Sequence, residues 1–153
     1  MTLHDTPTQN ILALVHAFLD ATVAAPSETM VDTHFADPAF IGDLSGIRSV
    51  PAAAISEGIA ARARLAAAAG PRETTLEEWE AIALGPVMVL ASARWRVASG
   101  DKAVDLVSDY LIDVSSGTAR CLSYSTRQNV MEVLAASGML PEPRTPDVPA
   151  APA

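Results

Sequence analysis

Two aspartates stand at positions where a carboxylate could do acid–base chemistry. Asp43 follows the short apolar run Phe40-Ile41 and precedes Leu44. At the mouth of an apolar pocket the charged carboxylate is poorly solvated, so its pKa rises and it accepts a proton more readily near neutral pH. The alternative is that Asp43 only closes a turn before Gly46, because aspartate tolerates such turns. The residue types alone leave both interpretations open.

Asp109 lies in a segment whose side chains alternate between two faces. One face carries Asp105, Val107, Asp109, Leu111 and Asp113, and the other carries Val104, Leu106, Ser108, Tyr110, Ile112 and Val114. Several aspartates on one face are typical of a solvated face. The competing interpretation, which we favour, places Val107, Asp109 and Leu111 in a cavity. The opposite, apolar face then needs a second subunit to cover it.

His16 is a third candidate for acid–base chemistry, at the edge of the apolar stripe of an N-terminal helix. Its alternative role is that of a hydrogen-bonded packing residue. Phe18, Phe35 and Phe40 are candidates to line a ligand pocket. The three histidines and Cys121 match no metal-ligand spacing, and no phosphate-binding or nucleophile motif is found, so we expect neither a metal nor a cofactor.

The composition excludes some classes of partner. The chain has 153 residues and a formal net charge of −8, so it repels nucleic-acid phosphates. We see no signal peptide, and no apolar stretch has the ~18–20 residues that a membrane span needs. With a single cysteine there is no internal disulfide. These features predict a soluble, cytoplasmic protein that contacts neither nucleic acid nor membrane.

The periodicity of apolar residues changes from helical to strand-like halfway along the chain. We predict helices from Pro7 to before Pro26, from Ser27 to before Asp37-Pro38, and over 51–69, with one short strand at 39–42. In the third helix we expect Ile55, Ile59 and Ala63 to face inward and Arg62 and Arg64 outward. Strands follow over 73–84, 87–98, 102–114 and 118–129, then a small helix over 130–137.

Helices followed by strands indicate an α+β fold, in which a curved sheet folded around its helices leaves a conical cavity. We expect one domain over 1–138. The proline-rich segment 139–153 is expected to be a disordered tail.

This order of elements, over roughly 7–130, resembles the nuclear transport factor 2-like superfamily and, within it, the SnoaL-like and ketosteroid-isomerase-like proteins. The stretches that carry the resemblance are "HFADPAFIGDLSG" (34–46), "GPVMVLASARWRV" (85–97) and "VSDYLIDVSSGTARCLSYST" (107–126). It implies a cone-shaped curved antiparallel sheet wrapped around three N-terminal helices and enclosing a pocket. It also implies a homodimer formed through the outer face of the sheet.

The resemblance implies roles for two residues. Asp43 falls where the isomerases have their proton-shuttling base, and Asp109 falls where they have the protonated aspartic acid of the oxyanion hole. The first helix offers no tyrosine to complete that hole, so steroid isomerisation itself is not implied. Arg94-Trp95-Arg96 stands where the epoxide-hydrolase members need Arg-x-Asp, so that activity is not implied either.

Two functions therefore remain open. One is a cofactor-independent isomerase or cyclase that moves a proton on a small apolar carbonyl compound, using Asp43 with Asp109 or His16. The other is a non-catalytic ligand-binding or dimerisation module of the same fold. For either, we expect a homodimer through the strand faces that carry Val89, Ala91, Trp95, Leu106, Tyr110 and Ile112.

Overall fold

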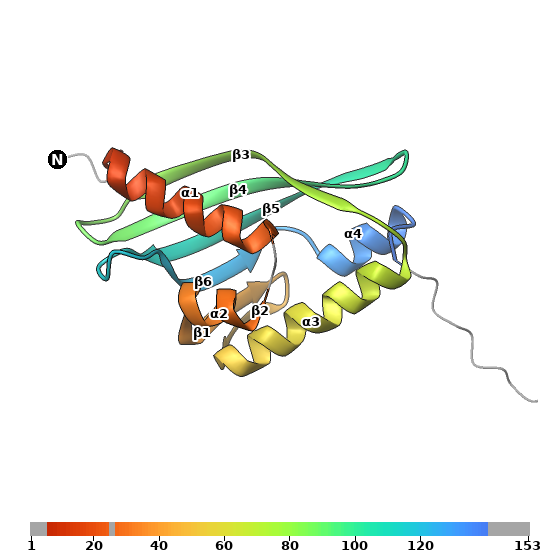
Figure 1. Ribbon diagram of the computed structural model, residues 1–153, viewed down its shortest axis with the longest axis horizontal. Helices are drawn as coiled ribbons and strands as arrows, with labels where there is room; N and C mark the ends of the chain where they lie inside the picture. Colours follow the sequence, from red (N-terminus) through yellow and green to blue (C-terminus); the bar gives the residue numbers. More distant parts are fainter. Residues whose placement is uncertain (1–5, 25–26, 141–153) are drawn as a thin grey trace, which may run out of the picture.

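The computed structural model describes residues 6–24 and 27–140, which form four helices and one six-stranded sheet. In chain order these are α1 (Gln9–Ala24), α2 (Glu28–His34), β1 (Phe35–Asp43), β2 (Gly46–Val50), α3 (Ala52–Ala68), β3 (Glu73–Ala83), β4 (Met88–Ser99), β5 (Lys102–Asp113), β6 (Arg120–Thr126) and α4 (Val130–Ala136) (Figure 1). The predicted tail from residue 141 onward lies outside the described residues.

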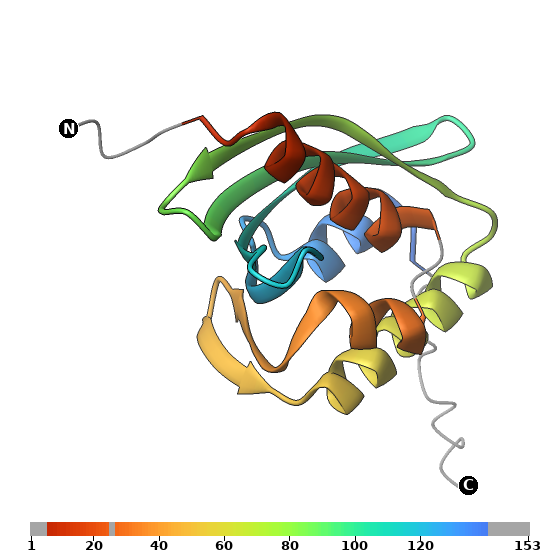
Figure 2. The same cartoon turned by 60° about the vertical axis from the view of Figure 1, so that its left-hand side comes forward.

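The sheet has the strand order β2-β1-β6-β5-β4-β3. Its neighbours are antiparallel except for β1 and β6, which are parallel. The sheet curves, and α1, α2 and α3 lie on its inner side (Figure 2). The predicted α+β class and the curved sheet around N-terminal helices are confirmed.

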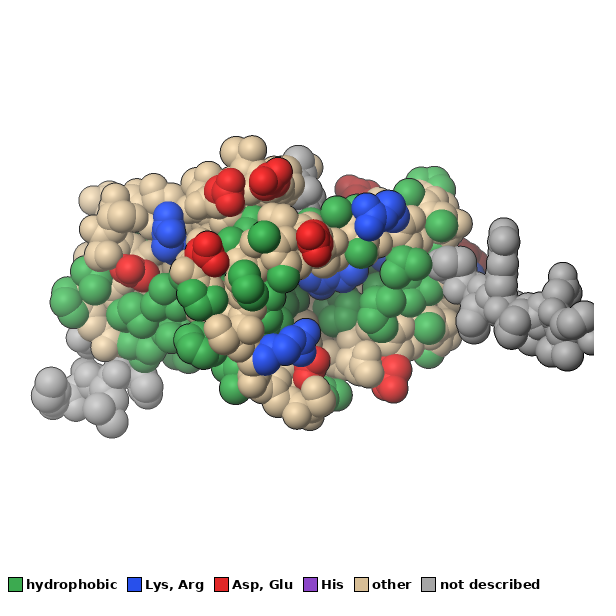
Figure 3. Space-filling view, turned by 90° about the horizontal axis from the view of Figure 1, so that it is seen from below, with side chains coloured by type: hydrophobic (Ala, Val, Ile, Leu, Met, Phe, Trp, Pro, Cys, Tyr) green, Lys and Arg blue, Asp and Glu red, His purple; other side chains and the backbone are tan. Residues whose placement is uncertain are grey.

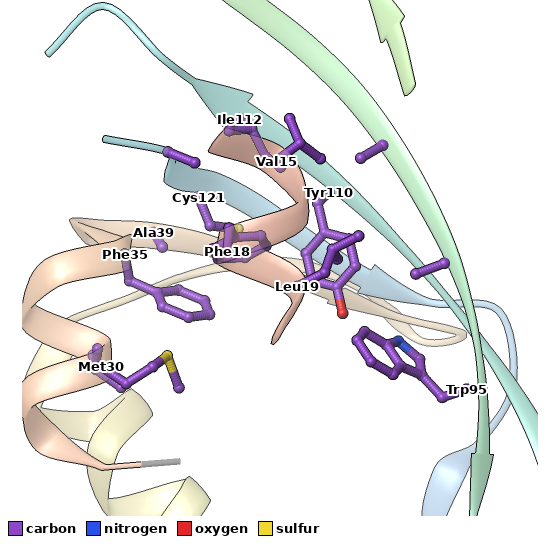
Figure 4. Close-up of a cluster of buried hydrophobic side chains, with 14 of the residues drawn as sticks. Val15, Phe18, Leu19, Met30, Phe35, Ala39, Trp95, Tyr110, Ile112 and Cys121 are labelled. Atoms are coloured by element: carbon purple, nitrogen blue, oxygen red, sulfur yellow. The ribbon is translucent and has the colours of Figure 1, made fainter. Parts of the chain in front are cut away.

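The helices begin and bury side chains where the sequence pattern places them. Ser27 caps α2, because its hydroxyl accepts a hydrogen bond from the backbone N–H of Met30 at 3.2 Å. The stripe of Val15, Phe18 and Leu19 on α1 is fully buried. Phe18 packs edge-on against Tyr110 of β5, with ring centroids 5.3 Å apart (Figure 4).

Buried and more exposed side chains alternate along β4 and β5, and their burial shows which face of the sheet is inside. The buried side chains of the two strands are Val89, Ala91, Ala93, Trp95, Val97, Leu106, Ser108, Tyr110, Ile112 and Val114. The prediction that the face with Val89, Ala91, Trp95, Leu106, Tyr110 and Ile112 forms a dimer interface is therefore wrong. These side chains are buried within the chain's own core, largely beneath its helices, and have no surface left for a partner.

Two differences from the predicted elements concern the edges of the fold. Strand β1 is longer than the strand predicted at 39–42, and it forms a hairpin with β2. The sequence pattern did not predict β2, because the side chains of β2 are almost all exposed. At the other end, the expected tail begins too early. Met139 is only 2% exposed and its backbone N–H donates to the Leu134 carbonyl at 2.8 Å, so the folded unit extends beyond residue 138.

Candidate functional site

A cavity of about 840 Å³ lies between α3 and the inner face of the sheet. Helix α3 lines the cavity with a broad face, and the stripe along the middle of this face consists of Ile55, Gly58, Ile59, Arg62 and Ala66. The sheet contributes inward side chains of β4, β5 and β6. Helix α4 and the residues after it border the cavity with Val130, Met131, Leu134 and Leu140.

The walls of this cavity are mainly apolar. The sheet side is formed by Trp95, Val97 and Leu106, and Met30 and Phe35 close the end nearest α2. The face of the molecule on the lower side of Figure 1 is hollowed near its centre, with hydrophobic side chains in the hollow and Lys or Arg atoms in and beside it (Figure 3). The volume falls within the ~300–1,000 Å³ that is usual for small-molecule sites.

A small group of polar side chains lies on the sheet side of the cavity. Ser108 and Tyr110 are each 4% exposed and both line the cavity from β5, and Tyr124 lines it from β6. The Tyr110 side chain points from its strand toward Trp95 (Figure 4). Burial, with a smaller contribution from Tyr124, raises the pKa of the Tyr110 phenol well above its ordinary value. The phenol therefore stays protonated and can hydrogen-bond a ligand, but it does not serve as a base at neutral pH.

Two arginines line the cavity near the end of α3. Arg72 precedes β3 and, by alternation with Thr74 and Leu76, points inward. Its Nη1 atom is buried and has no hydrogen-bond partner among the described residues. Arg62, on the cavity stripe of α3, is the second. Arg62 is exposed, as the sequence predicts, and it also lines the cavity, because it lies seven residues after Ile55 on the same face of the helix.

Asp43 does not lie in this cavity. It ends β1 and closes the turn to β2, where its Oδ1 accepts hydrogen bonds from both the backbone N–H (2.8 Å) and the hydroxyl of Ser45. Arg48 lies 3.7 Å from its other oxygen. The Ser45 hydrogen bonds, followed by the Arg48 charge, hold the pKa of Asp43 below its ordinary value. The expectation of a raised pKa is therefore wrong, because the carboxylate is exposed and hydrogen-bonded rather than desolvated.

Asp109, Val107 and Leu111 lie on the face of β5 opposite the cavity, so the expectation that they line it is wrong. Arg127 donates two hydrogen bonds of 2.8 Å to the Asp109 carboxylate, and the Ser92 hydroxyl donates a third at 2.6 Å. The Arg127 hydrogen bonds are the main reason that the pKa of Asp109 is lowered. The carboxylate is thus ionised on the outer face, not a neutral acid in an oxyanion hole.

The remaining predicted site residues are spread over three environments. His16 is exposed and does not border the cavity. Its ring stacks on that of Trp79 with centroids 5.5 Å apart, and its Nε2 lies 3.6 Å from Asp20 Oδ1. Phe18 is in the core, and Phe40 is 51% exposed. Phe35 does line the cavity. Of the predicted site residues, Phe35 is the one that the structure places there.

The residues that sequence reasoning missed are Ser108, Tyr110, Arg62 and Arg72. A signal for the first two was present, since their face of the strand carries the larger apolar residues and the other face carries three aspartates. Arg72 can be assigned to the inner face from the sequence only if the alternation of β3 is extended backward from Leu76 past Thr74.

The residues that the structure describes contain no group of three or more His, Cys, Asp or Glu side chains that could hold a metal ion. Of the helices in residues 6–24 and 27–140, none is both long and apolar enough to cross a membrane.

The fold is similar to that of several solved structures. A cystatin-like protein of unknown function from Nostoc punctiforme matches with a TM-score of 0.64 at 9% identity, covering 80% of this chain and 94% of that one. Aln2 from a Streptomyces species matches with a TM-score of 0.63 at 17% identity, covering 86% of this chain and 99% of that one. An NTF2-like protein with a cystatin-like fold from Novosphingobium aromaticivorans matches with a TM-score of 0.58 at 12% identity, covering 85% of this chain and 86% of that one.

No family model and no curated protein sequence matches the chain. The likeness is therefore one of structure, at identities that show the fold alone. The order of elements, the curved sheet and these neighbours together show that the chain has the nuclear transport factor 2-like fold.

Proposed function

We propose that this protein binds a small, largely apolar molecule in the cavity between α3 and the inner face of the sheet. The observation that carries the proposal is the cavity of about 840 Å³, whose mainly apolar walls also carry polar groups, among them Ser108, Tyr110 and Tyr124 on the sheet side. Binding sites for small molecules commonly combine mostly apolar walls with a few placed polar groups that orient the ligand.

Proton-transfer catalysis is not part of this proposal. An isomerase of the expected kind needs a base and an electrophilic partner that meet at the substrate. Asp43, Asp109 and His16 do not line the cavity, and the first two are held in their ionised form by hydrogen bonds and arginine charges. The geometry therefore favours the non-catalytic alternative, a ligand-binding module.

The test uses the neutral fluorescent probe N-phenyl-1-naphthylamine and two leucine substitutions on α3. Gly58→Leu adds a side chain on the cavity stripe, and Ala61→Leu adds a similar one at an exposed position that does not line the cavity. We expect the wild type and Ala61→Leu to bind the probe alike and Gly58→Leu to bind it roughly tenfold more weakly, about 1.4 kcal/mol. Equal binding by all three, or no binding by the wild type, would overturn the proposal.

A further inference from the structure

Arg72 is a candidate anion-binding residue of the cavity. Its guanidinium borders an apolar cavity, and Nη1 is shielded from water without a hydrogen-bond partner among the described residues. A guanidinium carries five donors in a planar fork and stays charged in proteins. Arg72 as a whole is half-buried, but a buried donor atom without a partner is costly, so an acceptor that reaches Nη1 contributes more than one at an exposed donor.

A second positive charge faces the same space. Arg62 borders the cavity from α3, and its charge, after burial, is the second cause that lowers the pKa of Arg72. Like charges held near each other repel, and an anion between or beside them relieves that repulsion. Arg62 lies in the second half of α3 and Arg72 directly precedes β3, so two parts of the fold contribute the pair.

Among the residues that the structure describes, no carboxylate forms an ion pair with Arg62 or Arg72. Within the described residues, Asp105 pairs with Arg94 and Arg96, and Asp109 pairs with Arg127, all through the outer face of the sheet. Glu73 also lines the cavity, but it makes no ion pair within 4.0 Å to Arg62 or Arg72 in the described part of the chain. The third arginine on the lining, Arg48, lies 3.7 Å from Asp43.

We propose that the ligand of this cavity is an amphipathic carboxylate, whose anionic head binds Arg72 with support from Arg62 and whose apolar body lies against Trp95, Leu106 and Ile59. This inference rests on the proposed function and names the chemical class of the ligand for the same site. A carboxylate matches the planar fork of the guanidinium and can accept two of its hydrogen bonds at once. The rest of the cavity then excludes water from the apolar chain.

The test compares three probes with the same eight-carbon chain and different heads: octanoate, octanol and octylammonium. Each displaces N-phenyl-1-naphthylamine from the full chain. In the wild type we expect octanoate to displace the probe at a roughly tenfold lower concentration than octanol, the effect of one charge-assisted hydrogen bond. We expect octylammonium to be weaker than octanol, because its charge has the sign of the arginines.

Substitutions then assign the effect to the arginines. Arg72→Gln should reduce the preference for octanoate over octanol to about threefold or less, and Arg62→Gln should reduce it partly, while octanol binding stays unchanged. Arg64→Gln is the matched control, because it removes the same charge from an exposed position of α3 that does not line the cavity. This control should keep the full preference for octanoate. Should Arg72→Gln fail to fold, Arg62→Gln and the comparison of heads in the wild type still test the idea.

The outcomes separate this inference from the proposed function. If octanol and the naphthylamine bind but octanoate has no advantage, the cavity binds apolar ligands and the assignment of a carboxylate is overturned. An octanoate preference that falls equally in Arg64→Gln would overturn the role of Arg72 and Arg62, since it would reflect net charge alone. If none of the molecules binds, the proposed function itself fails.

Discussion

Gly58 offers a quantitative test of the open space beside α3. It lies in the interior of this helix, on the stripe that lines the cavity, and a Cβ added there meets no heavy atom within 4 Å. Glycine in a helix interior costs about 0.8–1.0 kcal/mol relative to alanine, chiefly through the conformational freedom it loses on folding. Gly58→Ala should therefore raise the free energy of unfolding by about that amount. For a chain of this size the melting temperature rises by about 2–4 °C.

The assay is urea unfolding followed by circular dichroism, with the slope against urea expected to stay the same. Gly138→Ala is the contrasting variant, because Gly138 has φ of +75° and an added Cβ would lie 2.7 Å from Lys102 Nζ. It should destabilise the protein by about 1–2 kcal/mol, the usual cost of the left-handed conformation for other residues. If Gly58→Ala is neutral or destabilising, the side of α3 that faces the cavity is packed against something in solution. The description of an open cavity wall would then be wrong.

Three other predictions concern residues outside the cavity. Asp43→Asn should leave the free energy of unfolding nearly unchanged and the binding of the naphthylamine probe unaltered, since an amide oxygen can still accept the hydrogen bonds from Ser45; weaker probe binding by the variant in a titration would show that Asp43 belongs to the site. Asp109→Asn should destabilise the protein at neutral pH by about 1 kcal/mol or less, because the pair with Arg127 is partly exposed. Arg127 lowers the folded-state pKa of Asp109, so the stabilisation is present above the unfolded pKa of about 3.9 and is lost as the pH falls through the folded value. If urea unfolding in strong acid still gives a different free energy of unfolding for the wild type and Asp109→Asn, this explanation is contradicted. The Cys121 thiol, whose pKa burial raises to about 12, should react with a thiol reagent only as fast as the protein unfolds, and immediate labelling of the native protein would show the side chain to be accessible.

The elements of this fold could be predicted because local signals for them are strong. Ser27 is a cap followed by a helical stripe, and β4 and β5 alternate over their whole length. By contrast, β2 lacks a buried side chain to mark it, and its five residues end directly at Pro51. A strand whose stability comes from pairing with its neighbour leaves little trace in hydrophobic periodicity.

The site was harder to predict than the fold, for a reason visible in β5. Alternation separates Tyr110 from Asp109 but does not say which of the two faces the helices, and a shift by one residue exchanges the faces. The choice depended on the partner strands, where Trp95 lies opposite Leu106 on the buried face. Asp43 is hard to place from the sequence for a related reason, because the residues that surround it, Ser45 and Arg48, belong to the hairpin with β2.

The two tryptophans give the most direct measurement of whether the cavity binds a ligand. Trp95 lines the cavity, whereas Trp79 does not and stacks on His16. In a ¹H–¹⁵N spectrum, Trp95→Phe and Trp79→Phe assign the two indole N–H signals, and octanol is then titrated into the wild type. We predict that the Trp95 signal shifts and saturates while the Trp79 signal stays in place. A stationary Trp95 signal at saturating octanol, or equal shifts of both signals, would contradict ligand binding in this cavity.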